Sequence, residues 1–195
     1  NGHVRVYEWN ETAWVQKGFD INGEYLEDQS GWSVSLNNTG IILGSSSILN
    51  KGTNKPESGQ VRVYKWREYT QNDQDNLTYH YTSYTQDTTQ TKLLIITENL
   101  TTAPVIGNYY WTQMVFDIDG LNENDRSGFR IKIDKNGEKI GITSNNIGND
   151  ARGSFEVYKI REGGFDAEEH LKYDKLLVSD TDNNIIKQIL TTETV

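Results

Sequence analysis

The chain of 195 residues contains no cysteine, only two prolines and no run of basic residues. Without cysteine it has no disulfide scaffold, thiol nucleophile or cysteine-ligated zinc site. Its net charge of −9 disfavours binding to nucleic-acid phosphates and to anionic lipid. No apolar stretch reaches the roughly 18 residues of a membrane helix. We therefore expect no nucleic-acid partner and no membrane insertion.

Aromatic residues and glycine are plentiful, with 11 tyrosines, five tryptophans and 17 glycines. With few prolines, this composition is typical of a β-rich, turn-rich protein. The length corresponds to a single domain that is large enough to bury a core. Because the sequence starts at Asn1 and not at Met, we expect a processed product or an excised piece.

Internal repeats are the strongest signal in the sequence. Residues Gly2–Trp9 (GHVRVYEW) return 57 positions later as Gly59–Trp66 (GQVRVYKW). Residues Trp14–Gly23 (WVQKGFDING) return 97 positions later as Trp111–Gly120 (WTQMVFDIDG). Such ordered matches indicate duplication, and repeated units of this size are typical of stacked architectures.

One unit contains four strand-like runs, predicted at residues 14–21, 30–36, 41–45 and 61–66. In the second run Trp32, Val34 and Leu36 alternate with Ser33 and Ser35, which is the period of a half-buried strand. Four antiparallel strands in about 50 residues, repeated along a chain, predict a β-propeller blade. Stacked sheets or a β-sandwich are the alternatives.

The repeats divide the single predicted domain, 1–195, into four blades. Residues 2–66 and 111–162 form well-marked blades, and 67–110 forms a degenerate one. Residues 163–195 together with the N-terminal strand form the fourth. In this interpretation the N-terminal strand, 4–9, pairs near 184–191 and closes the ring within the chain. The rival is that the chain is part of a larger propeller.

The run DQSGWSVSL at 28–36, followed by Gly40, Gly44 and GQVRVY at 59–64, resembles the FG-GAP repeat. That repeat builds the propeller of integrin α-subunits and of many surface proteins. The opening Trp-x-Gln-x-Gly-x-Asp-Ile-x-Gly-Glu is similar to tandem repeats of marine bacterial surface proteins and of large algal or protist viruses. The resemblance covers 2–66 well and 111–162 moderately. It implies a binding or structural scaffold.

The resemblance also implies calcium, because blades of this family often carry an acidic loop between their first two strands. Oxygen ligands at alternating positions can surround a hard cation. The candidate ligands are Asp20, Asn22, Glu24 and Asp28 in the first loop, and Asp117, Asp119 and Asp125 in the second. Leu121 stands where the second loop needs a ligand, and Gly23 and Gly120 come earlier than the family's glycine. The alternative is that these aspartates cap local turns.

Four Asn-x-Thr sequons are candidate glycosylation sites. They begin at Asn10, Asn37, Asn76 and Asn99.

These observations predict a non-enzymatic structural or binding module of an extracellular surface, a cell surface, a filament or a virion. Its partners would be a protein or glycan ligand, or copies of itself. A tyrosine-rich region, 79–84 with 109–111, is one candidate contact surface, with packing between blades as the alternative. The runner-up function is a carbohydrate-active or other propeller enzyme with an unrecognised acidic site, since glycoside hydrolysis needs a pair of carboxyl groups.

Overall fold

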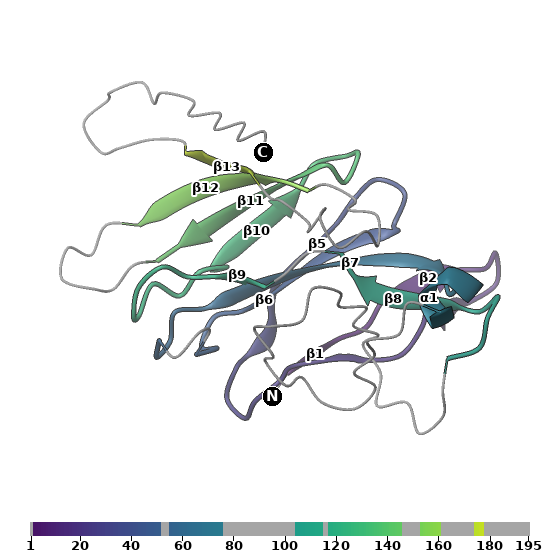
Figure 1. Ribbon diagram of the computed structural model, residues 1–195. Coiled ribbons are helices and arrows are strands. Elements are labelled where there is room, and N and C mark those ends of the chain that lie inside the picture. Colours follow the sequence, from purple (N-terminus) through teal and green to yellow (C-terminus); the bar gives the residue numbers. More distant parts are fainter. Residues whose placement is uncertain are drawn as a thin grey trace.

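The computed structural model describes residues 2–51, 55–75, 104–114, 117–145, 153–160 and 174–177. These residues form an all-β structure of antiparallel sheets, which confirms the predicted class (Figure 1). Within the described part, none of the sheets closes on itself and the one helix is the short α1 (Gln71–Asp75).

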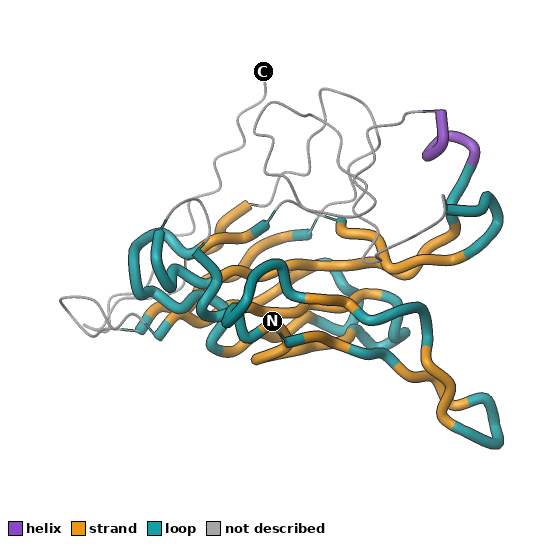
Figure 2. Tube along the Cα trace, turned by 90° about the horizontal axis from the view of Figure 1, so that it is seen from below, coloured by secondary structure: helices purple, strands orange, loops and turns teal. Residues whose placement is uncertain are grey.

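An N-terminal ribbon, defined as residues 2–22, consists of two short antiparallel pairs. Strand β1 (His3–Val4) pairs with β4 (Ile21–Asn22), and β2 (Tyr7–Trp9) pairs with β3 (Trp14–Gln16). Figure 2 shows the β2–β3 hairpin extending beyond the sheets that follow it.

The central sheet follows the ribbon in sequence and has the strand order β5-β6-β7-β8. Its members are β5 (Ser30–Leu36), β6 (Ile42–Ser47), β7 (Gln60–Glu68) and β8 (Tyr109–Gln113). Strand β9 (Ile118–Asp119) also pairs with β7, beyond the end of β8.

The second sheet has the order β10-β11-β12-β13. Its members are β10 (Arg130–Ile133), β11 (Lys139–Ser144), β12 (Ser154–Lys159) and β13 (Asp174–Leu177). By the sequence repeat, β10, β11 and β12 correspond to β5, β6 and β7.

The sequence repeat is also a repeat of strand register. In the ribbon Val4 lies opposite Ile21, and Trp9 lies opposite Trp14. In the central sheet the equivalent pairs are Val61 with Ile118 and Trp66 with Trp111. The parallel bridge between Gly2 and Ser30 likewise returns between Gly59 and Ser127. The ribbon therefore corresponds to β7, β8 and β9 alone.

The strands group differently from the sequence-based prediction. Residues 14–21 were expected to share a sheet with 30–36, but β3 and β4 pair backwards with β2 and β1. Three residues just before and within β5 have positive φ, namely Glu27 (75°), Gln29 (56°) and Gly31 (85°). Their equivalents Asn124, Arg126 and Gly128 do the same before β10. Left-handed residues at alternating positions redirect the backbone, so the chain leaves one sheet and starts the next.

Residues 69–108 connect β7 to β8, which are neighbours in the central sheet. The degenerate blade predicted over 67–110 falls mostly on 76–103, outside the described residues. The same is true of most of 163–195, so these two blades and the pairing near 184–191 stay predictions.

Two apolar cores join the ribbon and the two sheets into three layers (Figures 1 and 2). The core between ribbon and central sheet contains Val4, Val6, Ile21, Leu43, Tyr64 and Trp111. The core between the two sheets contains Ile42, Val61, Val63, Ile118, Ile131, Ile133, Ile140, Ile142, Tyr158 and Ile160. Each face of the central sheet therefore contributes to one core, which stabilises the stack. The ribbon leaves Trp32, Val34 and Leu36 of β5 exposed on its side of the sheet.

Candidate functional site

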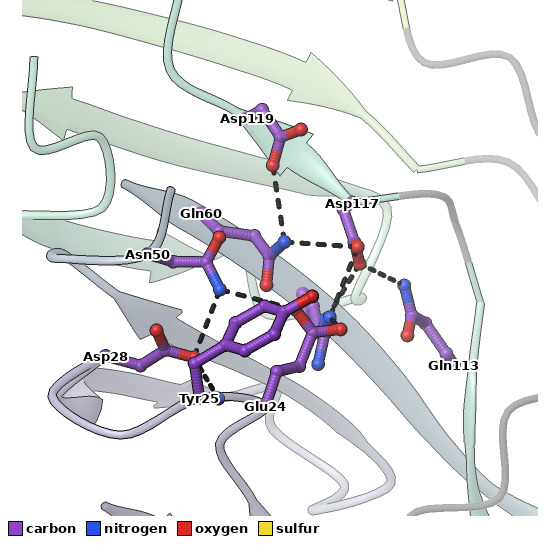
Figure 3. Close-up of polar contacts among 9 residues, drawn as sticks. Glu24, Tyr25, Asp28, Asn50, Gln60, Gln113, Asp117 and Asp119 are labelled. Atoms are coloured by element: carbon purple, nitrogen blue, oxygen red, sulfur yellow. Dashed lines mark hydrogen bonds and ion pairs between the residues drawn. The ribbon is translucent and has the colours of Figure 1, made fainter. Parts of the chain in front are cut away.

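A buried polar network lies where the loop after the ribbon meets β7 and β9 (Figure 3). At its centre the guanidinium of Arg62, on β7, binds Asp117 and Glu24. Arg62 Nε donates to Asp117 Oδ1 at 2.7 Å, and its Nη2 donates to Asp117 Oδ2 at 3.2 Å and to Glu24 Oε1. All three side chains are at most 11% exposed. A charge-assisted cluster of this kind is strong because its members are removed from water and bonded to each other.

Two glutamines complete the shell around Asp117. Gln113 Nε2 donates to Asp117 Oδ1 at 2.8 Å, and Gln60 Nε2 donates to Asp117 Oδ2 at 3.1 Å. The amide of Gln60 also reaches Asp119 Oδ1 at 3.3 Å. Burial by itself would lower the pKa of Arg62, but the neighbouring charge of Asp117 outweighs it and the pKa is raised.

The first acidic loop is tied to the same network through Asn50. Its side-chain amide donates to Glu24 Oε2 at 3.3 Å and to Asp28 Oδ2 at 3.1 Å. Asp28 also accepts the backbone N–H of Tyr25 at 2.8 Å, which closes the turn. Burial raises the pKa of Asp28 above its usual range. In the copy, Asp125 accepts the backbone N–H of Asn122 at 2.7 Å in the same way.

The ribbon contains an exposed version of the Arg62 network. Arg5 donates two bonds of 2.7 Å to the carboxylate of Asp20, and Gln16 donates a third at 2.9 Å. The hydrogen bond from Arg5 is the main cause that lowers the pKa of Asp20 to about 2. Arg5, Gln16 and Asp20 occupy the repeat positions of Arg62, Gln113 and Asp117. The same hydrogen-bonded ion pair therefore occurs twice.

The predicted calcium ligands do not converge on a common point. Asp20 and Asp117, the first position of each loop, bind arginine, and Asp28 and Asp125 cap turns. Asn22 is an exposed residue of β4. In the described residues no group of three or more acidic or histidine side chains could hold a metal ion. As placed, these side chains do not fit calcium, because Arg62 is already the cation between Glu24 and Asp117. Titration with calcium tests the predicted site directly.

The sequence analysis missed the arginines and amides of the network. Arg62, Gln60, Gln113 and Asn50 were not candidates, although the signal was available in part. Val-Arg-Val-Tyr and Trp-x-Gln are kept in both copies. Arg5 and Asp20 return together as Arg62 and Asp117, which would have allowed them to be considered as a pair.

Two of the four sequons lie in described residues. Asn10 is exposed in the turn between β2 and β3, where its Oδ1 accepts the backbone N–H groups of Thr12 and Ala13. Asn37 is buried, and its side chain binds the backbone of Ile41 and Ile42 and the hydroxyl of Thr39. Asn76 and Asn99 lie outside the described residues, as do 79–84 of the tyrosine-rich region.

One cavity lies between the turns that end β5 and β10. It has a volume of about 720 Å³, and its lining includes Asn37, Lys65, Met114, Lys135 and Glu138. Its wall mixes amide, charged and apolar groups and draws on both sheets.

Replacing Arg5 with methionine should raise the pKa of Asp20 from about 2 toward 3.8, its ordinary value. A carboxyl group with a lowered pKa stabilises the fold above its ordinary pKa, and this contribution is lost as the pH falls through the lowered value. The window is therefore about pH 4 to pH 2. NMR titration of the Asp20 side chain tests this, and an unchanged titration in the Arg5→Met variant would contradict the assigned cause.

Comparison with known proteins gives no match to a family model, a curated protein or a solved structure. In the residues that the structure describes, no helix is long and apolar enough to span a membrane.

Proposed function

We propose that the chain is a non-enzymatic structural or binding module, built from FG-GAP-type β-propeller blades, of an extracellular surface, a filament or a virion. The supporting observation is that the same interlayer construction is used twice with equivalent residues. Val4 and Ile21 pack the ribbon on the central sheet, as Val61 and Ile118 pack the central sheet on the second one. Successive four-stranded antiparallel sheets that pack face to face are the arrangement of propeller blades.

The charged groups support a scaffold role as well. Arg62, Asp117 and Glu24 bind one another within the stack, and Asp28 and Asp125 hold turns. Carboxylates used in this way link layers and loops. A glycosidase would need two of them converging on a substrate.

The contact surface that we propose is an aromatic surface on the ribbon, defined as Tyr7, Trp9 and Trp14. Trp9 and Trp14 pack against each other with ring centroids 5.7 Å apart, and all three side chains are exposed. Their equivalents Tyr64, Trp66 and Trp111 are largely covered by the ribbon. This equivalence favours a protein layer, including a second copy of the chain, as the partner of the aromatic surface over a glycan.

The test compares the native chain with the double variant Trp9→Ala/Trp14→Ala. We expect the native chain to self-associate in sedimentation velocity or to bind a protein or glycan ligand, and the variant to lose that binding with an unchanged melting midpoint. Binding that survives in the variant would reject the aromatic surface. Turnover of glycoside substrates by the native chain would reject the non-enzymatic role.

Calcium is tested separately. We expect calcium to leave the melting midpoint of the native chain unchanged, because Arg62 already neutralises Glu24 and Asp117. Magnesium is the control for ionic strength. A midpoint that rises with calcium alone, and no longer rises in the Asp28→Asn variant, would show that the first loop rearranges into a calcium site.

A further inference from the structure

One face of β5 leaves an apolar strip in contact with solvent. The strip consists of Trp32, Val34 and Leu36, which are 45%, 51% and 42% exposed. The ring of Trp32 also packs against Phe129 with centroids 5.9 Å apart, so Val34 and Leu36 are its uncovered part. Strand β5 is the edge strand of the central sheet, and its outer edge is met in the described residues only by the bridge from Gly2 to Ser30 at its start. Alternating apolar side chains on an exposed edge strand are a liability that proteins normally cover.

The repeat shows what covers such a strip elsewhere in the same molecule. Ile131 and Ile133 on β10 are the equivalents of Val34 and Leu36, yet they are only 7% and 2% exposed. The β5–β6 hairpin of the central sheet covers them. The backbone N–H of Ile131 donates to Ser33 Oγ at 3.1 Å, and that of Ile133 donates to Ser35 Oγ at 3.0 Å.

The β5–β6 hairpin contacts Ile131 and Ile133 of β10 through small residues. A Cβ atom at Gly44, on β6, would lie 3.1 Å from the end of Ile131 and 3.2 Å from the ends of Ile133 and Ile140. Glycine therefore lets the isoleucines approach the backbone of β6. A hairpin that covers such a strip therefore carries serine hydroxyls on one strand and a glycine on the other.

The ribbon covers the rest of the face of the central sheet that carries the Trp32–Val34–Leu36 strip. Its residues Val4, Val6 and Ile21 pack on Leu43, Tyr64 and Trp111, and equivalents of β5 and β6 are absent from the described residues 2–22. Apart from the bridge between Gly2 and Ser30, β1 and β2 pair in the described residues only with β4 and β3, whereas the equivalent strand β7 also pairs with β6. The apolar strip and an unpaired strand edge therefore lie next to each other and continue the interface that the ribbon already makes. A complete sheet of a second copy would overlap the ribbon, so two strands fit this position and four do not.

We propose that the Trp32–Val34–Leu36 strip is the docking site for a β-hairpin of the β5–β6 kind from a neighbouring repeat unit. The second strand of this hairpin pairs with the free edge of β1 and β2, which is β-strand addition, and its small residues cover the strip. This inference rests on the proposed function, because it names the partner that the layered module takes at its first layer.

The experiment keeps the whole chain and supplies the hairpin as an extension. A second copy of residues 30–58 is placed before Gly2 in place of Asn1, since Ser58–Gly59 is the repeat equivalent of Asn1–Gly2. We expect the melting midpoint to rise by about 5 °C or more, because the strip and the strand edge become buried. The control extension carries Gly44→Lys within the added copy, which places a charged side chain against the strip and should remove the gain.

Val34→Asp in the original chain makes the test specific. In the unextended chain its effect should stay below about 2 °C, because Val34 faces solvent there. In the extended chain it should cancel most of the gain, since the two sites then contact each other. An extended chain with the native midpoint, an equal gain from the Gly44→Lys extension, or a gain that depends on protein concentration would each overturn the proposal. None of these measurements involves Trp9 or Trp14, so failure here is distinguishable from failure of the aromatic surface.

Discussion

The Arg62→Met variant should lose about 3–5 kcal/mol of unfolding free energy, the usual cost of breaking a buried ion pair from one side. The substitution keeps most of the side-chain volume but removes the charge and the donors that hold Asp117 and Glu24. Those carboxylates are 8% and 6% exposed, so water replaces the lost partner poorly. In a chain of this length the loss corresponds to a midpoint lower by about 6–20 °C.

The repeat provides a matched control for this prediction. Arg5→Met removes the equivalent arginine from the equivalent aspartate, but Arg5 is 45% exposed and Asp20 is 31% exposed. Exposed pairs contribute little because water and salt screen them, so this variant should melt close to the native chain. Arg62→Lys should fall in between, since a lysine keeps the charge but lacks the planar fork. Equal midpoints for Arg62→Met and Arg5→Met would show that the buried network does not stabilise the stack.

The Trp111→Ala variant should also lose about 3–5 kcal/mol, as expected when a buried large aromatic residue is truncated. Trp111 is 1% exposed, and its ring lies 5.5 Å from that of Trp66. Its Nε1 donates to the backbone oxygen of Lys17 at 2.8 Å, which fastens the ribbon to the central sheet. The variant loses the apolar contact, and the Lys17 oxygen loses its indole donor.

Trp14→Ala is the control at the same repeat position. Trp14 is 68% exposed, so its removal should change the midpoint only slightly. Trp111→Phe should recover part of the packing but not the hydrogen bond to Lys17. Thermal and urea unfolding measure all three variants. Similar losses for Trp111→Ala and Trp14→Ala would contradict the layered arrangement, in which only Trp111 is covered by another layer.

Local strand structure could be predicted well from the sequence. The period-two pattern of Ser30–Leu36 predicted β5 with its observed bounds, because alternating side chains report the two faces of a strand directly. The run over 14–21 was predicted as one strand and forms two, β3 and β4, separated by residues 17–20. In that interval Gly18 has a positive φ, and the carboxylate of Asp20 is held by Arg5. Neither feature is visible in an apolar pattern.

The partners of each strand and of each charge could not be predicted in the same way. Acidic residues at alternating positions are compatible with a cation site and with turn caps. The choice depends on whether an arginine from a neighbouring strand reaches them. Arg62 and Glu24 are distant in sequence, and the fold brings them together only because the central sheet lies against the loop after the ribbon. The sheet to which β3 and β4 belong was likewise decided by left-handed residues before β5.

The sequence by itself determined the all-β class, the duplication and the positions of most strands, because these depend on local periodicity and on repeated residues. Only the tertiary structure decided which copy of each duplicated residue is buried. Trp111 and Trp14, Arg62 and Arg5, and Ile131 and Val34 are equivalent by sequence, yet one member of each pair is covered and the other contacts solvent. The physical reason is that burial is a property of the layer that packs above a residue, and that layer comes from a distant part of the chain.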